Sequence, residues 1–177
     1  MRKRAGVLVA VAMIVSAGVM VSPAGAATGT TCKTASGTAT FTPPLPKPGA
    51  STKVSPTIKI TGTLGGCTGG GVTGGTISAT LKQAIAGNCS SLLKGATANI
   101  AGTETITWNT KATSTVALKL VGVTGKVTET NATGPVSAGL FKGSKQSGTV
   151  AYTPLNHGCS TAGLAKVTFK QVTAITV

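Results

Sequence analysis

The chain has 177 residues, with 16 lysines and arginines against two glutamates, no aspartate and a single histidine, His157. Acid–base and nucleophilic catalysis usually recruits histidine or carboxylates in tuned pairs, so this composition predicts a protein without catalytic residues. We also expect no cofactor and no metal site, because no CxxC or CxxH pair provides the close ligand spacing of a zinc centre.

The first residues predict export from the cell. A basic segment, Met1-Arg2-Lys3-Arg4, precedes an apolar run from Ala5 to Val21, and the small residues Ala24-Gly25-Ala26-Ala27 follow. This is the pattern of a secretory signal peptide over residues 1–27, and we expect cleavage after Ala26 or Ala27. An uncleaved membrane anchor is the alternative, because the apolar run reaches the lower limit of about 17 residues for crossing a bilayer.

Cleavage would leave one domain, residues 28–177, with no membrane span and enough length for a hydrophobic core. Its charge would come from 13 lysines against Glu104 and Glu129, a formal net charge of +11. Such a charge attracts polyanions such as wall teichoic acids or lipid headgroups. The lysines are scattered along the sequence, which also fits a merely solvated surface. Residues 28–177 contain no arginine, which argues against specific recognition of nucleic acid.

The rest of the chain predicts strands, because threonine, valine and isoleucine alternate between glycine-rich turns. Strands are expected, in chain order, over Lys33–Phe41, Thr57–Leu64, Thr76–Lys82, Glu104–Trp108, Thr113–Leu120, Val123–Thr130, Gly148–Tyr152 and Ala165–Val177. About eight or nine short strands predict an all-β fold. We expect an antiparallel two-sheet β-sandwich, immunoglobulin-like or similar, with a closed β-barrel as the alternative.

The alternation also assigns side chains to faces. Trp108 is in phase with Ile106, so we expect it in the core, and Tyr152 in phase with Val150 is expected to be buried too. Glu104 and Glu129 lie in expected strands in which threonine alternates with other residues, and both are assigned to the solvent face. This placement argues against a glycosidase carboxylate pair.

Four cysteines in an exported chain predict two disulfides. Cys32 begins the first expected strand and Cys67 ends the second, so antiparallel strands would bring them to the same end. Cys67 and Cys89, in contrast, would lie at opposite ends of a hairpin, too far apart for a bond. The preferred pairs are therefore Cys32–Cys67 and Cys89–Cys159.

Two low-complexity segments are candidate interaction loops. The proline-rich segment predicts a stiff connector that protects a sheet edge, or alternatively a polyproline ligand for a partner. The glycine-rich segment over 65–75 predicts a flexible hairpin loop anchored by one disulfide, and it lacks the ending of a phosphate-binding loop. The residues singled out in the two segments are Pro43, Pro44, Pro46, Pro48, Gly69, Gly70 and Gly71.

Several strand-and-turn motifs are similar to those of a known group. The runs GTETITWN over 102–109, LGGC over 64–67 and VSAGLFKG over 136–143 resemble the uncharacterised secreted all-β proteins of actinobacteria, which are rich in threonine and glycine and carry two disulfides. The resemblance implies export and a β fold, and implies no activity. The lysine content and the missing aspartate depart from the more neutral or acidic composition of that group.

These features together predict a secreted, non-enzymatic structural or binding protein of the cell envelope or extracellular medium. Its expected partner is a cell-wall polyanion or an extracellular protein. An extracellular enzyme inhibitor or protein-binding module that uses the candidate loops is the first alternative. A hydrolase that uses His157 is the second.

Overall fold

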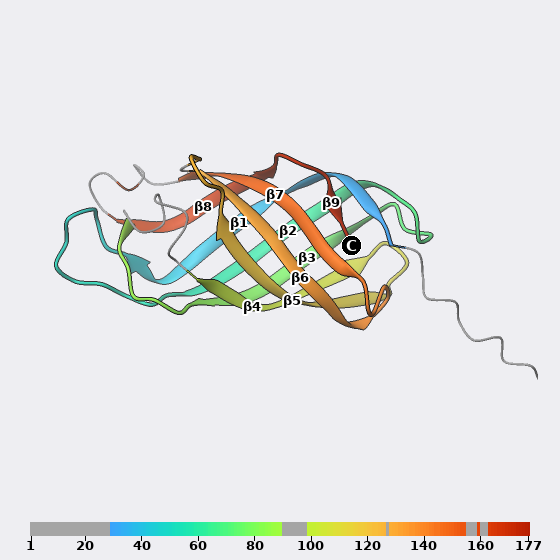
Figure 1. Ribbon diagram of the computed structural model, residues 1–177, viewed down its shortest axis with the longest axis horizontal. Coiled ribbons are helices and arrows are strands. Elements are labelled where there is room, and N and C mark those ends of the chain that lie inside the picture. Colours follow the sequence, from blue (N-terminus) through green and yellow to red (C-terminus); the bar gives the residue numbers. More distant parts are fainter. Residues whose placement is uncertain (1–28, 90–98, 127, 155–158, 160–162) are drawn as a thin grey trace, which may run out of the picture.

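The computed structural model describes residues 29–89, 99–126, 128–154, 159 and 163–177. These residues form nine strands, and every pairing between them is antiparallel (Figure 1). The strands are β1 (Thr31–Leu45), β2 (Thr57–Thr68), β3 (Gly74–Gln83), β4 (Ile100–Trp108), β5 (Thr113–Gly122), β6 (Glu129–Gly139), β7 (Lys145–Pro154), β8 (Leu164–Gln171) and β9 (Ile175–Thr176). The predicted all-β, antiparallel class is confirmed.

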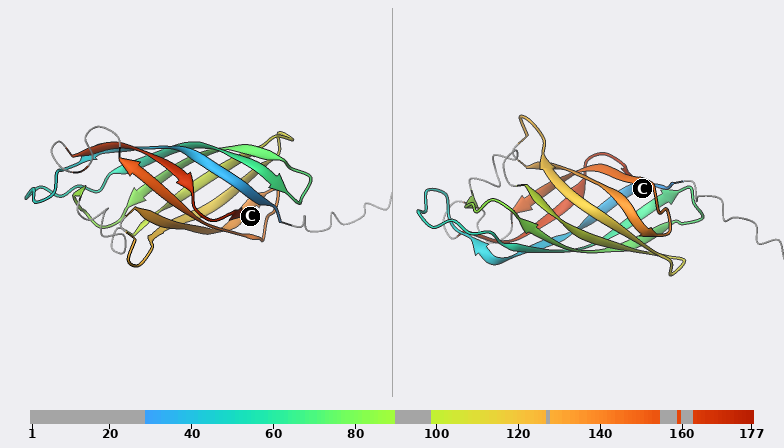
Figure 2. Two further views of the ribbon diagram at one scale, coloured as in Figure 1. Left: turned by 90° about the horizontal axis from the view of Figure 1, so that it is seen from above. Right: turned by 60° about the horizontal axis from the view of Figure 1, so that its bottom comes forward.

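All nine strands belong to one sheet, and the last long strand pairs with the first. Each strand from β1 to β7 pairs with the next one, and β8 pairs back with β1, so that eight strands form a closed ring. The short β9 pairs with β1 and β7. The strands run obliquely around a common interior (Figure 2).

The expected division into two sheets does not occur in these pairings, which agree with the closed alternative. Alternation of apolar and polar residues shows that a strand buries one face. It does not show whether that buried face packs against a second sheet or against the opposite wall of the same closed sheet. The ring is closed by hydrogen bonds between β1 and β8, which are far apart in the chain. Closure gives each of these eight strands a partner on both sides.

Two predicted strands differ from the structure. The strand expected over Ala165–Val177 is divided into β8 and β9 by residues 172–174, and the strand expected over Val123–Thr130 is wrong. Residues 123–126 form a turn in which the Lys126 amide donates to the Val123 carbonyl, and the Val123 amide donates to the Glu129 carbonyl. Gly125 adopts a positive φ of 77° there, a conformation that glycine takes without steric cost. The strand β6 starts only at Glu129 and continues through Gly134 and Pro135 to Gly139.

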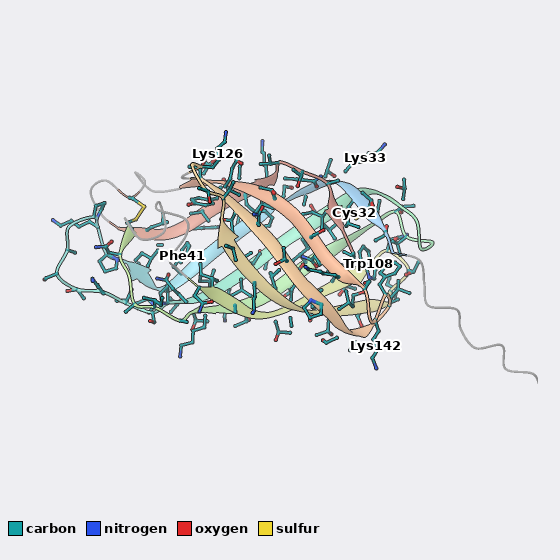
Figure 3. The ribbon with its side chains drawn as sticks, in the orientation of Figure 1. Cys32, Lys33, Phe41, Trp108, Lys126 and Lys142 are labelled. Carbon is teal, nitrogen blue, oxygen red and sulfur yellow. A yellow bond between two sulfur atoms is a disulfide. The ribbon has the colours of Figure 1, made fainter. Side chains whose placement is uncertain are left out.

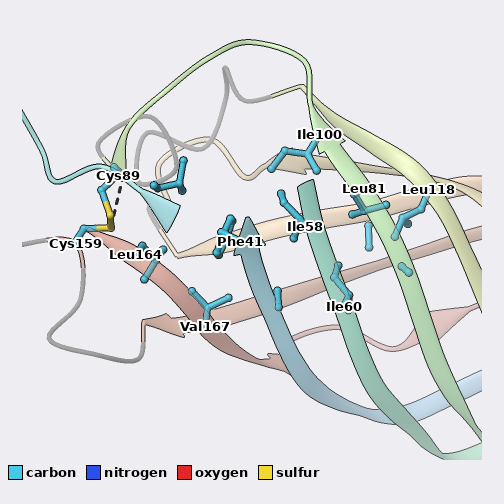
Figure 4. Packing of buried hydrophobic residues seen from close by; sticks show 14 residues of the cluster. Phe41, Ile58, Ile60, Leu81, Cys89, Ile100, Leu118, Cys159, Leu164 and Val167 are labelled. Carbon is cyan, nitrogen blue, oxygen red and sulfur yellow. Dashed lines mark hydrogen bonds between the residues drawn. A yellow bond between two sulfur atoms is a disulfide. The ribbon is translucent and has the colours of Figure 1, made fainter. Parts of the chain in front are cut away.

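The buried residues form two clusters, one toward each end of the sheet. We call the first the Phe41 end; it contains Ala39, Phe41, Leu45, Ile58, Ile60, Ala79, Leu81, Cys89, Ile100, Leu118, Ala132, Cys159, Leu164 and Val167 (Figure 4). We call the second the Trp108 end; it contains Cys32, Ala35, Leu64, Cys67, Val72, Ile106, Trp108, Val116, Val136, Phe141, Ile175 and Val177. Phe41 and Trp108 lie in opposite halves of the molecule (Figure 3).

Each end carries one disulfide. The bond between Cys32 and Cys67 joins β1 to β2 at the Trp108 end. The bond between Cys89 and Cys159 joins the segment after β3 to the segment before β8 at the Phe41 end (Figure 4). These are the two pairs predicted from the strand directions, and two disulfides fit an extracellular protein.

Large side chains fill the Trp108 end. The Trp108 ring is 1% exposed and meets Phe141 edge to face, with ring centroids 5.4 Å apart. Its Nε1 donates to Ser114 Oγ at 2.8 Å, and Ser114 Oγ in turn donates to the Leu140 carbonyl. The predicted core position of Trp108 is confirmed, and its indole N–H has the partner that a buried tryptophan usually finds.

Candidate binding site in the interior

The interior of the sheet contains a cavity of about 110 Å³. All nine strands contribute to its wall, and the wall is mostly apolar. The lining residues are Ala35, Ala39, Phe41, Ile58, Ile60, Leu64, Ile77, Ala79, Ile100, Glu104, Leu118, Leu120, Thr130, Ala132, Gln146, Val150, Tyr152, Val167, Phe169 and Ile175.

The space exists because several inward positions carry very small side chains. Ala35 and Ala39 on β1, Ala79 on β3 and Ala132 on β6 all line the cavity. A closed ring of about eight strands leaves an interior that is either filled by side chains or just wide enough for one small ligand. For comparison, an engineered apolar cavity of about 150 Å³ stays dry and binds benzene or xenon. The volume here therefore suits a molecule of similar or slightly smaller size.

Glu104 faces this interior, and its predicted position on the solvent face is wrong. The residue is 2% exposed and lines the cavity. Ile106 and Trp108 follow it on β4 at intervals of two, and both are buried. Successive side chains of a strand alternate between faces, so Glu104 must share the face of Trp108. The spacing of two residues from Ile106 and Trp108 is visible in the sequence, and it determines the direction of the Glu104 side chain despite the polarity of the carboxyl group.

Gln146 is the partner of Glu104 and was not predicted as a site residue. Gln146 lies on β7, across the interior from β4, and its Nε2 donates to Glu104 Oε2 at 3.0 Å. The side chain is 3% exposed, and its Oε1 has no hydrogen-bond partner among the described residues. Its parity with Val150 and Tyr152 on β7 could have placed it inside, but nothing in the sequence links positions 104 and 146.

Burial controls the electrostatics of Glu104. Removal from water raises the pKa of this carboxyl to about 7, against a smaller lowering by the hydrogen bond from Gln146. No lysine of the described segments is among the cavity-lining residues. Tyr152 lines the same cavity, and burial raises the pKa of its hydroxyl to about 12. Glu104 is thus the group in this wall that can change charge near neutral pH.

The two candidate interaction loops do not come together. Pro43 and Pro44 are exposed in β1 at the Phe41 end, and Pro46 and Pro48 follow in the connection to β2. Gly69, Gly70 and Gly71 lie in the turn between β2 and β3, beside the disulfide of Cys67 at the Trp108 end. The hairpin turn lies at the opposite end from the prolines and is shorter than the loop expected over 65–75, because β2 continues to Thr68 and β3 starts at Gly74.

Within the described part of the chain, the other charged candidate residues lie outside the cavity wall. Glu129 is on the surface with Lys126 at 4.0 Å, and His157 lies outside the described residues. Lys33, Lys126 and Lys142 are exposed at separate places on the molecule (Figure 3). Over the described parts of the chain, no group of three or more histidine, cysteine, aspartate or glutamate side chains could hold a metal ion.

Within those same residues, no helix has the length and apolar character needed to cross a bilayer. Comparisons with models of protein families, with curated proteins and with solved structures gave no significant match. The functional proposal below therefore depends on the geometry of the interior.

Proposed function

We propose that the protein is an exported, non-enzymatic binding protein that holds a small, mostly apolar molecule inside its closed sheet. The cavity of about 110 Å³ carries this proposal. Ligand sites are typically concave and apolar, with a few well-placed polar groups that orient the ligand. The cavity has this composition, with Glu104 and Gln146 together at one place in a wall that is otherwise apolar except for Thr130 and the Tyr152 hydroxyl.

The surroundings of Glu104 support binding rather than catalysis. Its hydrogen-bond partner is the Gln146 amide, which is neither a nucleophile nor a second acid. General acid–base and covalent mechanisms need such a partner within hydrogen-bond reach. The two disulfides and the signal peptide pattern of the first 27 residues support export.

A cell-wall polyanion is a second candidate partner, on the outer surface. The strand register places Lys59 and Lys166 on either side of Thr40, and all three residues are exposed. Electrostatic contacts of this kind weaken as salt increases. Cofractionation with the wall that high salt reverses would support this association, and recovery only from the medium would count against it.

The interior site can be tested with isopentane, a small apolar probe, and NMR of isotope-labelled alanine methyl groups. We expect saturable shifts at the cavity-lining methyls of Ala39, Ala79 and Ala132. The methyls of Ala117 and Ala138 are exposed and should not move. Saturable shifts confined to the lining alanines would support the proposal, and their absence would overturn it.

A pair of variants provides the matched control. Ala79→Leu places a larger side chain in the cavity and should abolish isopentane binding. Ala117→Leu makes the same change on an exposed position of β5 and should leave binding intact. Unchanged binding in Ala79→Leu would show that the probe occupies another site.

A further inference from the structure

The polar part of the cavity wall offers hydrogen-bond acceptors. Gln146 Nε2 already donates to Glu104 Oε2, whereas Gln146 Oε1 is buried without a partner in the described residues. A buried acceptor without a partner costs free energy that a donor on a ligand would recover. The Glu104 carboxyl lies beside this oxygen and accepts hydrogen bonds in its ionised form. The site is therefore complementary to a ligand group that donates hydrogen bonds.

The number of donors narrows the ligand class. A hydroxyl has one O–H and can satisfy one of the two oxygens, and a quaternary ammonium has no N–H at all. A carboxylate or phosphate would bring further acceptors and a negative charge to a buried carboxyl. A primary ammonium has three N–H groups and a positive charge, so it can bind both Glu104 and Gln146 Oε1 and neutralise the carboxylate.

The apolar wall limits the size and polarity of the rest of the ligand. Apart from the polar pair, Thr130 and the Tyr152 hydroxyl, the lining side chains are apolar, and the volume of about 110 Å³ is smaller than that of an engineered cavity of about 150 Å³ that binds benzene. We infer that the preferred ligand is a small primary amine with a compact apolar body, its ammonium group held between the Glu104 carboxylate and Gln146 Oε1. This inference rests on the proposed function, because it names the ligand class of the same cavity.

Isobutylamine and isopentane test the inference, because they differ by an ammonium group in place of a methyl group. We expect the wild-type protein at about pH 8, where Glu104 is ionised, to bind isobutylamine at least about tenfold more tightly than isopentane. If isopentane binds and isobutylamine does not bind better, the inference is wrong and the proposed function stands. If neither binds, both fail. Isobutanol or isobutyrate binding as tightly as isobutylamine would also overturn the inference.

Substitutions of the polar pair should remove the preference for the amine. We expect Glu104→Gln to reduce isobutylamine affinity about tenfold or more and to leave isopentane affinity nearly unchanged. Gln146→Leu should give a smaller loss, because it removes one neutral acceptor. Glu129→Gln is the matched control, since this glutamate lies outside the cavity beside Lys126. Equal losses in Glu104→Gln and Glu129→Gln would show a nonspecific charge effect and contradict the inference.

A measurement on the unaltered protein avoids any dependence on the folding of these variants. The chain has only two glutamates, so isotope labelling of glutamate carboxyl carbons gives two glutamate carboxyl signals. At about pH 6 isobutylamine should move the Glu104 signal toward its ionised position, because the bound ammonium favours the charged form. The Glu129 signal serves as the reference. A Glu104 signal that does not respond to saturating isobutylamine would overturn the inference.

Discussion

The two ends of the closed sheet bury side chains in different ways. At the Trp108 end, two aromatic rings meet edge to face and fill the interior. Between this end and the Phe41 end, Ala35, Ala39, Ala79 and Ala132 occupy inward positions and leave a cavity. Both regions belong to the same ring of strands with the same alternation. Side-chain volume at a few inward positions, rather than the fold, therefore determines whether such an interior is a core or a site.

Two buried polar side chains, Ser114 and Gln146, also differ, although Gln83 Oε1 and Gln171 Oε1 outside the cavity wall are likewise buried without a partner among the described residues. Ser114 at the Trp108 end accepts from Trp108 Nε1 and donates to the Leu140 carbonyl, so its hydroxyl is satisfied on both sides. In the cavity, Gln146 Oε1 has no partner among the described residues. A satisfied network stabilises one arrangement, whereas an unsatisfied one is costly unless a ligand or water completes it. We read the first as structural and the second as functional.

The strongest challenge to this comparison is removal of the largest side chain at the filled end. Trp108→Ala should lower the free energy of unfolding by about 3–5 kcal/mol, because it opens a large cavity in a packed region. It also leaves Ser114 Oγ without its indole donor. Urea unfolding measures the change, and Thr103→Ala on the exposed face of the same strand is the control. A loss below about 1 kcal/mol would show that this end is not tightly packed.

A smaller effect is expected from the carboxyl in the cavity. The pKa of Glu104 is raised from 4.5 to about 7 in the folded protein, so the folded state retains a proton that the unfolded chain releases. The free energy of unfolding should therefore be highest below pH 4.5 and fall as pH rises through 7. By linkage the fall amounts to about 3 kcal/mol.

Comparison with Glu104→Gln isolates this contribution from those of other titrating groups. The difference in unfolding free energy between the two proteins should change by about 3 kcal/mol between acid and neutral pH. Urea unfolding at several pH values provides the measurement. A difference that stays constant with pH would mean that Glu104 is not buried as described.

The smallest effects come from enlarging one side chain in each region. Val116→Leu at the Trp108 end should cost about 1–3 kcal/mol, because a packed interior has no space for another methylene. Ala79→Leu should change stability by less than about 1 kcal/mol, because its added atoms enter an existing cavity. Thermal or urea unfolding of both variants suffices. A reversed order of the two losses would invalidate the distinction between a filled and a hollow region.

Local patterns in the sequence predicted much of the fold. Period-two alternation indicated the strands, and strand direction indicated the disulfide pairs Cys32–Cys67 and Cys89–Cys159. The turn at Gly125 was missed because the valines and threonines on either side of it have high strand propensity. Closure of the ring depends on pairing between β1 and β8, which no local pattern contains.

The site was less predictable than the fold. The inward position of Glu104 followed from its parity with Trp108, but the polarity of a carboxylate favoured the surface. The pairing of Glu104 with Gln146 spans 42 residues and depends on how the ring closes. The cavity volume is the volume enclosed by the sheet minus the volume of the side chains inside it. Alternation along the strands shows only which residues face inward.

We propose that the hollow interior of the sheet admits small molecules. The most direct test is a crystal structure of the protein under xenon pressure, because xenon enters apolar cavities of this size. We expect xenon among Ala39, Ala79 and Ala132 in the wild-type protein and none at that position in Ala79→Leu. An interior without xenon in the wild-type protein, or xenon unaffected by Ala79→Leu, would contradict it.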